Sequence, residues 1–320
     1  MHRSLKDYII VTFKGLAMGA ADVIPGVSGG TIAFISGIYE ELIQSIDNLS
    51  LEVFKIWKKT GFKAAWQSIN GNFLLALFSG IAISILSLAK IIKWLLANEP
   101  ILLWAFFFGL VLSSILFIAK QIKNWNVTTL IAIIITSVVS YLITLAEPFA
   151  SPDSSIYLLF CGFTAIIAMI LPGVSGAFIL LILGAYQTAI ETVNNLVEGI
   201  LKSNFELFKD AFINFLLLAI GAVVGLKVFS KILNWMFQHK KNITLAILTG
   251  FMIGSLNKIW PWKETLTWRI NSHNEKVPFL EESISPFAFQ GHNQLLFALG
   301  LMILGFLTIF ILERLGAKKQ

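Results

Sequence analysis

The stretch Asp22-Val-Ile-Pro25-Gly26-Val-Ser28-Gly29-Gly30-Thr31 lies in the middle of an apolar segment that runs from Tyr8 to Ile46. The Pro25-Gly26 pair predicts a break in a helix, because proline lacks an N–H donor and its ring clashes with the preceding turn. Inside a bilayer, the backbone groups that a break frees need partners in protein, ligand or trapped water. The stretch therefore predicts a re-entrant helical hairpin over residues 8–46, with arms at 8–24 and 28–46.

A second copy of this pattern lies in the other half of the chain. Pro172-Gly173-Val174-Ser175-Gly176-Ala177-Phe178 follows the first copy at a constant spacing of 147 residues, which also relates Gly37 to Gly184. Further matches at a spacing of 141 residues relate Gly80 to Gly221. An ordered series of this kind predicts a duplicated fold. Three predicted spans, an odd number, separate the two hairpins, so the second copy is expected to be inverted.

The composition is that of a membrane protein. Hydrophobic residues make up 57% of the chain and charged residues only 13%, whereas about a quarter of a soluble domain is charged. The net charge of +6 is interpreted as a topology signal and not as a nucleic-acid surface. The single Cys161 and four scattered histidines suggest neither an internal disulfide nor a metal site, and no cofactor is expected.

We predict an all-α polytopic membrane protein with two inverted-topology repeats, each a re-entrant helical hairpin plus three transmembrane helices. Residues 1–150 form the first repeat, with the hairpin at 8–46, an amphipathic interfacial helix at 51–69, and spans at 73–96, 101–119 and 127–146. Residues 151–320 form the second, with the hairpin at 156–194, an interfacial segment at 196–212, spans at 212–237, 243–259 and 295–312, and an external loop at 260–293.

Two further features follow from these segments. If both hairpins are re-entrant, the predicted cytoplasmic segments hold nearly twice as many Lys and Arg residues as the external ones. The positive-inside rule then predicts that both termini are cytoplasmic. Within the external loop, residues 265–270 alternate apolar and polar side chains ahead of the polar run 271–274, which predicts a small β-hairpin.

The residues after each break predict an anion site. A helix N-terminus presents unpaired backbone N–H groups and about half a positive charge, and glycine lets an anionic group approach the backbone closely. The predicted phosphate-binding residues are Ser28, Gly29, Gly30 and Thr31 in the first copy and Ser175, Gly176 and Ala177 in the second. The alternative is that Pro25-Gly26 and Pro172-Gly173 only form tight re-entrant turns that let helices pack closely.

Charged residues at membrane depth are expensive and tend to be functional. Asp22, whose counterpart is Met169, either carries a coupling proton or caps and pairs locally, for example with Lys14. Lys90 and Lys231 occupy equivalent positions. They either snorkel to the interface or, with Lys14, attract an anionic headgroup.

Gly19-Ala-Ala-Asp22-Val-Ile-Pro25-Gly26-Val-Ser28-Gly29-Gly30-Thr31, together with Pro172–Gly176, resembles the PopT-type family of bacterial polyprenyl-phosphate translocases, and the resemblance covers essentially the whole chain. It implies a lipid flippase that is not an enzyme. Its substrate would be undecaprenyl phosphate, the recycled lipid carrier of cell-wall synthesis. The lipid would return from the outer to the cytoplasmic leaflet of the bacterial cytoplasmic membrane. The partners so implied are this lipid and the bilayer, with protons as a candidate coupling ion and no nucleic acid.

Two other functions remain open from the sequence. An ion-coupled transporter of a small soluble anion would use the same site. The first copy is also similar to the Pro-Gly-x-Ser-Arg-Ser loop of membrane undecaprenyl pyrophosphate phosphatases. However, Gly29 and Gly30 replace the Arg and the second Ser, and no Glu-x-x-x-Glu precedes the loop. The electrostatic and acid–base groups that pyrophosphate cleavage needs are thus missing from the motif.

Overall fold

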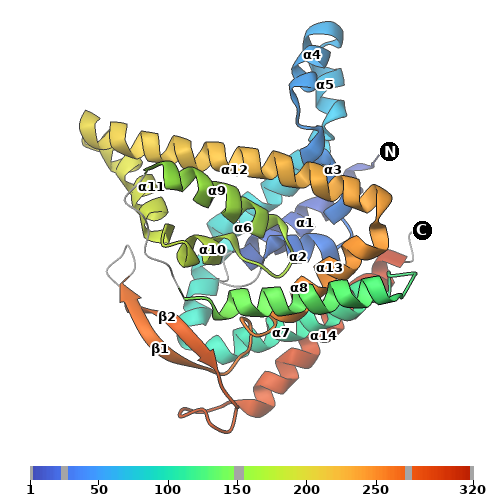
Figure 1. The fold of residues 1–320 in the computed structure, drawn as a ribbon, viewed down its shortest axis with the longest axis vertical. Coiled ribbons are helices and arrows are strands. Elements are labelled where there is room, and N and C mark those ends of the chain that lie inside the picture. The colour runs from blue at the N-terminus through green and yellow to red at the C-terminus, as the bar shows by residue number, and fades with distance from the viewer. Residues whose placement is uncertain (1–2, 23–27, 148–154, 271–275, 318–320) are drawn as a thin grey trace.

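The computed structural model describes residues 3–22, 28–147, 155–270 and 276–317. Figure 1 shows a bundle of helices with one two-stranded sheet at its edge. The first half contains α1 (Leu5–Asp22), α2 (Gly29–Ile35), α3 (Tyr39–Asn48), α4 (Leu51–Thr60), α5 (Phe62–Ser68), α6 (Gly71–Asn98), α7 (Pro100–Ala119) and α8 (Val127–Leu145). The second half contains α9 (Ser155–Ile170), α10 (Gly176–Ile182), α11 (Tyr186–Leu201), α12 (Phe205–His239), α13 (Lys241–Ser255), β1 (Lys263–Ile270), β2 (Lys276–Ser283) and α14 (Leu295–Ala317).

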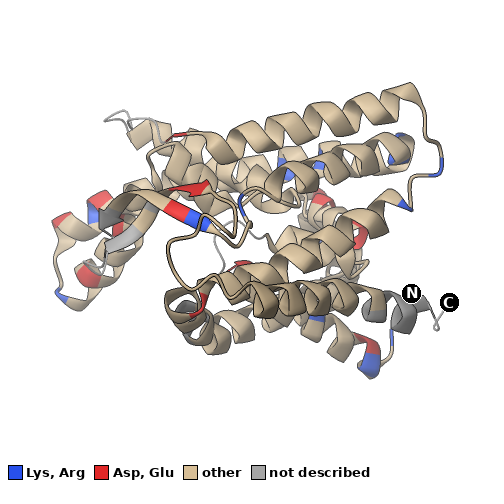
Figure 2. Cartoon of the chain, turned by 90° about the horizontal axis from the view of Figure 1, so that it is seen from below, with Lys and Arg blue, Asp and Glu red and all other residues tan. Residues whose placement is uncertain are grey.

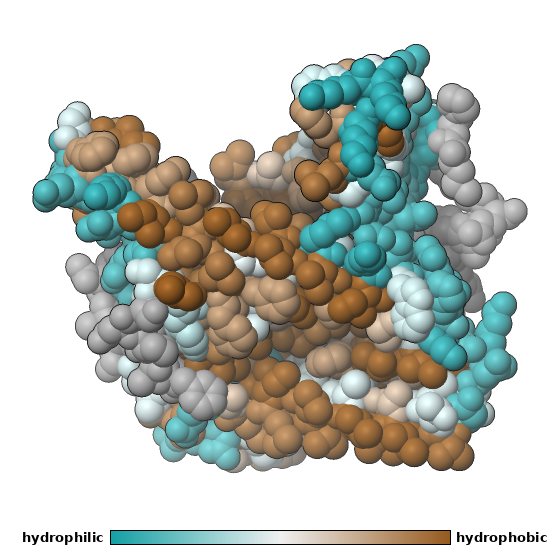
Figure 3. Space-filling model, turned by 45° about the horizontal axis from the view of Figure 1, so that its top comes forward, coloured by the Kyte–Doolittle hydropathy of each residue, from teal (hydrophilic) through white to brown (hydrophobic). Residues whose placement is uncertain are grey.

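The protein is a mostly helical, multi-pass membrane protein. Among the described residues, α6, α7, α8 and α12 are long and apolar enough to cross a bilayer, and α10 with α11 adds a fifth crossing if this pair, bent by 110°, is counted as one. Large apolar side chains are exposed along α8 and α12, as expected for surfaces that face lipid. Charged residues gather at helix ends and on the sheet (Figure 2). A broad hydrophobic band crosses the helices, while hydrophilic residues cover the projecting α4 and α5 (Figure 3).

Glycines let the long helices pack in close pairs. A Cβ on Gly15 of α1 would lie 2.2 Å from the Leu77 carbonyl oxygen of α6. Equivalently, a Cβ on Gly162 of α9 would lie 2.2 Å from the Leu218 oxygen of α12. In addition, α7 packs on α14 and α8 packs on α13. Small residues at such crossings are the usual means by which membrane helices approach one another.

The second arm of each hairpin is broken, so the continuous arm predicted at 28–46 is wrong. Gly37 separates α2 from α3 with φ +71°, and Gly184 separates α10 from α11 with φ +69°. Glycine adopts this left-handed backbone without steric penalty. The Ile38 N–H donates to the Ala33 oxygen at 3.0 Å, and the Ala185 N–H donates to the Leu180 oxygen at 2.9 Å. Both copies therefore end their short helix with the same turn.

The two predicted interfacial segments also differ from the structure. Gly61, at φ +91°, divides the helix predicted at 51–69 into α4 and α5. The segment predicted at 196–212 is not a separate element, because α11 continues to Leu201 and α12 begins at Phe205. The side chain of Asn204 caps the start of α12 by accepting from the Leu207 N–H at 3.2 Å, and α12 is therefore longer than the span predicted at 212–237.

The β-hairpin predicted within the long loop is confirmed. Strands β1 and β2 pair antiparallel, from Lys263 opposite Ser283 to Ile270 opposite Lys276, and the predicted turn at 271–274 lies outside the described residues. The base of the hairpin is fixed by Trp262, which is buried with Ala105 of α7 and Ala298 of α14. Its Nε1–H donates to the Asn293 oxygen at 2.8 Å. The loop is therefore anchored to the membrane helices.

Candidate functional site

The two Pro-Gly segments meet inside the protein. The Gly173 N–H donates to Thr31 Oγ1 at 2.9 Å, and the Ser28 hydroxyl donates to the Met169 carbonyl oxygen at 3.1 Å. Ser28 and Thr31 are both 1% exposed. Each hairpin thus satisfies polar groups of the other where neither water nor lipid reaches them. Pro25 and Gly26 lie outside the described residues, whereas Pro172 is buried and Gly173 has φ +88°.

The start of α2 lies directly against the end of α9. A Cβ on Gly30 would lie 2.6 Å from the Ile170 carbonyl oxygen, so a larger residue would force the helices apart. The hydroxyl of buried Tyr39 donates to the same oxygen at 3.0 Å, and its ring packs on Phe34 and Phe237. Sequence analysis did not assign Tyr39 to the site. The signal for it in the sequence is that Tyr186 follows it at the same spacing of 147 residues that relates the two copies.

Asp22 caps the first copy. Its Oδ1 accepts from the Gly29 N–H at 2.6 Å, while Ser28 Oγ accepts from the Gly30 N–H at 3.1 Å and the Ser28 carbonyl accepts from the Thr31 N–H at 2.9 Å. A carboxylate is favoured at a helix N-terminus. The backbone donors that the sequence assigned to a phosphate are therefore occupied by the protein's own groups.

The alternative pairing of Asp22 with Lys14 is wrong. Lys14 Nζ instead donates to the Ser36 carbonyl oxygen at 2.6 Å, at the C-terminal end of α2, where a cation is favoured by the helix dipole. Of the other two predicted lysines, Lys231 is exposed on α12. Lys90 belongs to α6, and its side chain lies outside the described part of the chain. Lys14, which is bound at the end of α2, and Lys231, which is exposed on α12, therefore do not form one cluster.

The second copy is more open than the first. Ser175 begins α10, and within the described residues its side chain makes no capping hydrogen bond. Gly176 is half-buried and Ala177 is exposed, whereas their counterparts Gly29 and Gly30 are buried. The following residue, Phe178, is covered by the ammonium group of Lys258, 4.6 Å from the ring centroid.

Hydrogen bonds and an ion pair connect α3 to the second half of the protein. The carboxylate of Asp47, at the end of α3, accepts from Asn234 Nδ2 at 2.8 Å, and Lys227 donates to the Asp47 carbonyl oxygen. Glu40, at the start of α3, pairs with Lys241 of α13 at 2.6 Å. Sequence analysis gave no signal for these pairs, because their members lie about two hundred residues apart.

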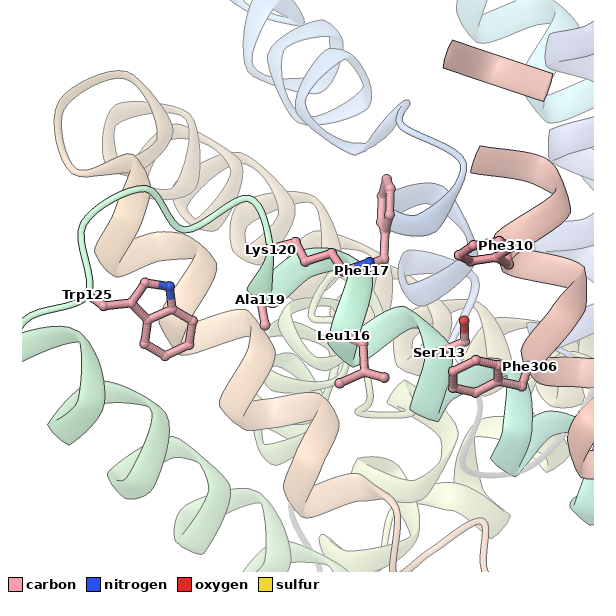
Figure 4. Close-up of a pocket in the computed structure, with 8 residues that line it drawn as sticks. All are labelled: Ser113, Leu116, Phe117, Ala119, Lys120, Trp125, Phe306 and Phe310. Atoms are coloured by element: carbon pink, nitrogen blue, oxygen red, sulfur yellow. The ribbon is translucent and has the colours of Figure 1, made fainter. Parts of the chain in front are cut away.

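Two cavities of similar size lie among the described residues. The first measures about 390 Å³ between α7 and α14 (Figure 4) and is lined by Ser113, Leu116, Phe117, Ala119, Lys120, Trp125, Phe306 and Phe310. The second measures about 420 Å³ at the base of the β-hairpin and is lined by Phe108, Leu256, Asn257, Trp260, Ser283, Ile284 and Ser285. None of the predicted phosphate-binding residues lines either one.

Comparison with known proteins gives consistent matches. Residues 18–277 match a family described as VCA0040-like, undecaprenyl phosphate translocase-like. A polyprenyl-phosphate transporter of Vibrio cholerae is 44% identical over 316 residues, which cover 98% of both chains. A polyprenyl-phosphate transporter of Staphylococcus aureus is 32% identical over 263 residues, which cover 78% of this chain and 84% of the relative. No solved structure matches the chain.

The contact between the two Pro-Gly segments can be tested at Thr31. Thr31→Val keeps the shape of the side chain but leaves the Gly173 N–H without its acceptor, which should lower the free energy of unfolding by about 1–3 kcal/mol. Thr31→Ser retains the acceptor oxygen and is the matched control. Thermal unfolding of the purified variants in detergent measures the difference. Equal melting temperatures for the two variants would contradict the role assigned to this hydrogen bond.

Proposed function

The chain belongs to the undecaprenyl phosphate translocase-like (VCA0040-like) family, and we propose that it moves undecaprenyl phosphate from the outer to the cytoplasmic leaflet of the bacterial cytoplasmic membrane. The observation that carries this proposal is the direct hydrogen bond between Thr31, two residues after the first Pro-Gly-Val-Ser-Gly segment, and Gly173 in the second. Transporters built from broken helices bind their substrate where such segments meet. A polyprenyl phosphate suits this arrangement, since its phosphate can cross within the protein while its chain remains in lipid.

An inverted repeat is part of the proposal and is supported by the packing partners. Matching the halves pairs α1 with α9, α6 with α12, α7 with α13 and α8 with α14. The α1–α6 contact then corresponds to the α9–α12 contact, and the α7–α14 contact corresponds to the α13–α8 contact. The second correspondence crosses between the halves, as a two-fold relation between them requires.

Alternating access is supported by a difference between the halves. Helix α3 of the first hairpin is bound to α12 of the other half through Asp47. Its counterpart α11 packs on α12 within its own half. With both termini in the cytoplasm, α3 lies on the cytoplasmic side, so we infer a state that is closed toward the cytoplasm. Release of the Asp47 contacts would open that side.

The phosphate is proposed to bind at the two helix starts, to Ser28–Thr31 from one side and to Ser175–Ala177 from the other. In the first copy it would replace the Asp22 carboxylate, which holds the Gly29 N–H. Two negative groups cannot share these donors without repulsion. Uptake of a proton by Asp22 would free the Gly29 N–H for the phosphate, which is the coupling step that we propose.

The function is tested with purified protein in liposomes that contain labelled undecaprenyl phosphate. We expect the label to become accessible in the opposite leaflet in proportion to the amount of protein, with no release of free phosphate. Liposomes without protein are the control. Phosphate release would instead identify an enzyme. Uptake of a soluble anion without movement of the lipid would identify a carrier of small anions, and either outcome would overturn the proposal.

The roles of the two serines are tested together. Ser28→Ala combined with Ser175→Ala removes one hydroxyl from each helix start and is expected to slow lipid movement at least tenfold, because charge-assisted hydrogen bonds to a phosphate are worth about 1.5–3 kcal/mol each. Circular dichroism and thermal unfolding check that the protein remains folded. Unchanged transport by the folded double variant would assign both motifs to packing alone.

Proton coupling is tested at Asp22. Asp22→Asn keeps an oxygen that can accept from the Gly29 N–H but removes the titratable charge, so transport should lose its dependence on pH. The measurement is the initial rate of lipid movement in liposomes buffered from pH 5.5 to pH 8.5, with wild-type protein as the reference. A pH profile that keeps its wild-type shape in the variant would remove Asp22 from the proton route.

A further inference from the structure

Two lysines next to the second Pro-Gly segment share a single carboxylate. Lys258 follows α13, Lys263 begins β1, and Glu281 belongs to β2. The ammonium nitrogens of the lysines lie 3.9 Å and 3.7 Å from the same atom, Glu281 Oε2. Both distances are too long for hydrogen bonds. The cluster therefore carries an excess positive charge that its own carboxylate does not neutralise.

This excess charge is buried. The side chain of Lys263 is only 8% exposed and that of Lys258 is 17% exposed. Among the described residues, Lys263 Nζ has no hydrogen-bond partner. Besides Glu281, the ammonium group faces the ring of Trp104 in α7, whose centroid lies 3.9 Å away. A buried ammonium group without hydrogen bonds is unfavourable, and a bound anion is one of the partners that would satisfy it.

The titration of Lys263 agrees with this picture. Burial, aided by the repulsion from Lys258 and opposed by Glu281, lowers the pKa of Lys263 to about 8. The pKa of Lys258 is also lowered by burial. Because the unfolded chain binds a proton here more tightly than the folded chain does, the charged form of Lys263 destabilises the fold below about pH 8. An anion that binds to Lys263 would remove this penalty.

The cluster of Lys258, Lys263 and Glu281 lies close to the second Pro-Gly segment, where the phosphate is proposed to bind. Lys258 covers the ring of Phe178, which directly follows the second Pro-Gly segment. A Cβ on Gly173 in that segment would lie 2.7 Å from Ser255 Oγ, at the end of α13. Asn257, beside Lys258, lines the cavity of about 420 Å³ at the base of the β-hairpin. Lys258 therefore lies next to a residue that lines this cavity and against a residue in the first turn of α10.

We propose that Lys258 and Lys263 form a binding site for a phosphate monoester at the hairpin side of the protein. This inference rests on the proposed function, in which both termini are cytoplasmic and the β-hairpin is external. The site would then receive the headgroup from the outer leaflet. A phosphate monoester carries up to two charges and three acceptor oxygens, so it can satisfy both ammonium groups at once. Free inorganic phosphate has the same chemistry.

A purely structural role for the lysines makes a different prediction. If Lys263 only anchored the β-hairpin through Glu281, its loss would lower the melting temperature. If it forms a ligand site, Lys263→Met removes a buried charge without hydrogen bonds. The melting temperature without ligand should then stay unchanged or rise, because binding residues are often kept at the expense of stability.

The experiment uses the full chain purified in detergent and two probes, inorganic phosphate and a water-soluble prenyl monophosphate. Binding is measured by isothermal titration and by the ligand-induced rise in melting temperature. Lys263→Met and Lys258→Met should each weaken binding at least tenfold, and Lys263→Arg should restore it in part. Lys202→Met, which removes an exposed lysine, is the matched control and should bind as wild type does.

The outcomes distinguish a lipid headgroup from free phosphate as the ligand. They also distinguish failure of the lysine site from failure of the proposed transport function. Lysine-dependent binding of the prenyl monophosphate alone supports the site with a lipid headgroup as its ligand, and equal binding of inorganic phosphate supports it with the phosphate group as the whole determinant. Wild-type binding by both methionine variants, or a lower melting temperature for Lys263→Met with unchanged affinity, overturns the site. If wild-type protein moves no lipid in liposomes but binds phosphate through the lysines, the proposed function fails and the site stands.

Discussion

The fold depends on one constraint, that polar backbone groups freed by a helix break inside the membrane must find partners in the protein. The hydrogen bond from the Gly173 N–H to Thr31 Oγ1 meets it. A helix that breaks inside a bilayer frees polar backbone groups that lipid cannot satisfy. Here the groups around each break find partners in the other hairpin, as the contact of Ser28 with Met169 and that of Tyr39 with Ile170 show. Each hairpin therefore supplies hydrogen-bond partners to the other, which couples the stability of the two halves.

Local rules predicted much of the fold. Hydropathy located the long helices, because each one needs an apolar stretch of its own, and alternation of polar and apolar residues located the β-hairpin. The breaks at Gly37 and Gly184 were not predicted, since a glycine in an apolar run is compatible with a continuous helix until its φ is known. The division of 51–69 at Gly61 was missed for the same reason.

The candidate site could be predicted only in part. The sequence allowed Asp22 either to carry a coupling proton or to cap or pair locally, and the structure shows that its carboxylate accepts from the Gly29 N–H. It could not identify contacts such as Asp47 with Lys227, or the sharing of Glu281 by two lysines. These pairings depend on how the helices and the loop are arranged in space, and no spacing along the chain encodes them.

The helix that follows each copy of the Pro-Gly motif begins at the same Ser-Gly pair, but the two starts differ in how their backbone N–H groups are capped. In the first copy, Asp22 and Ser28 accept from the backbone donors, whereas in the second copy the Ser175 side chain makes no capping hydrogen bond among the described residues. A carboxylate that belongs to the protein is a natural competitor for a phosphate, because both prefer the same donors. A site closed by its own anion binds substrate only when that anion is displaced or neutralised. In the transport cycle proposed above, competition of this kind would link the arrival of the phosphate to a change of state of the protein, because a ligand shifts a conformational equilibrium only through its different affinity for the two states.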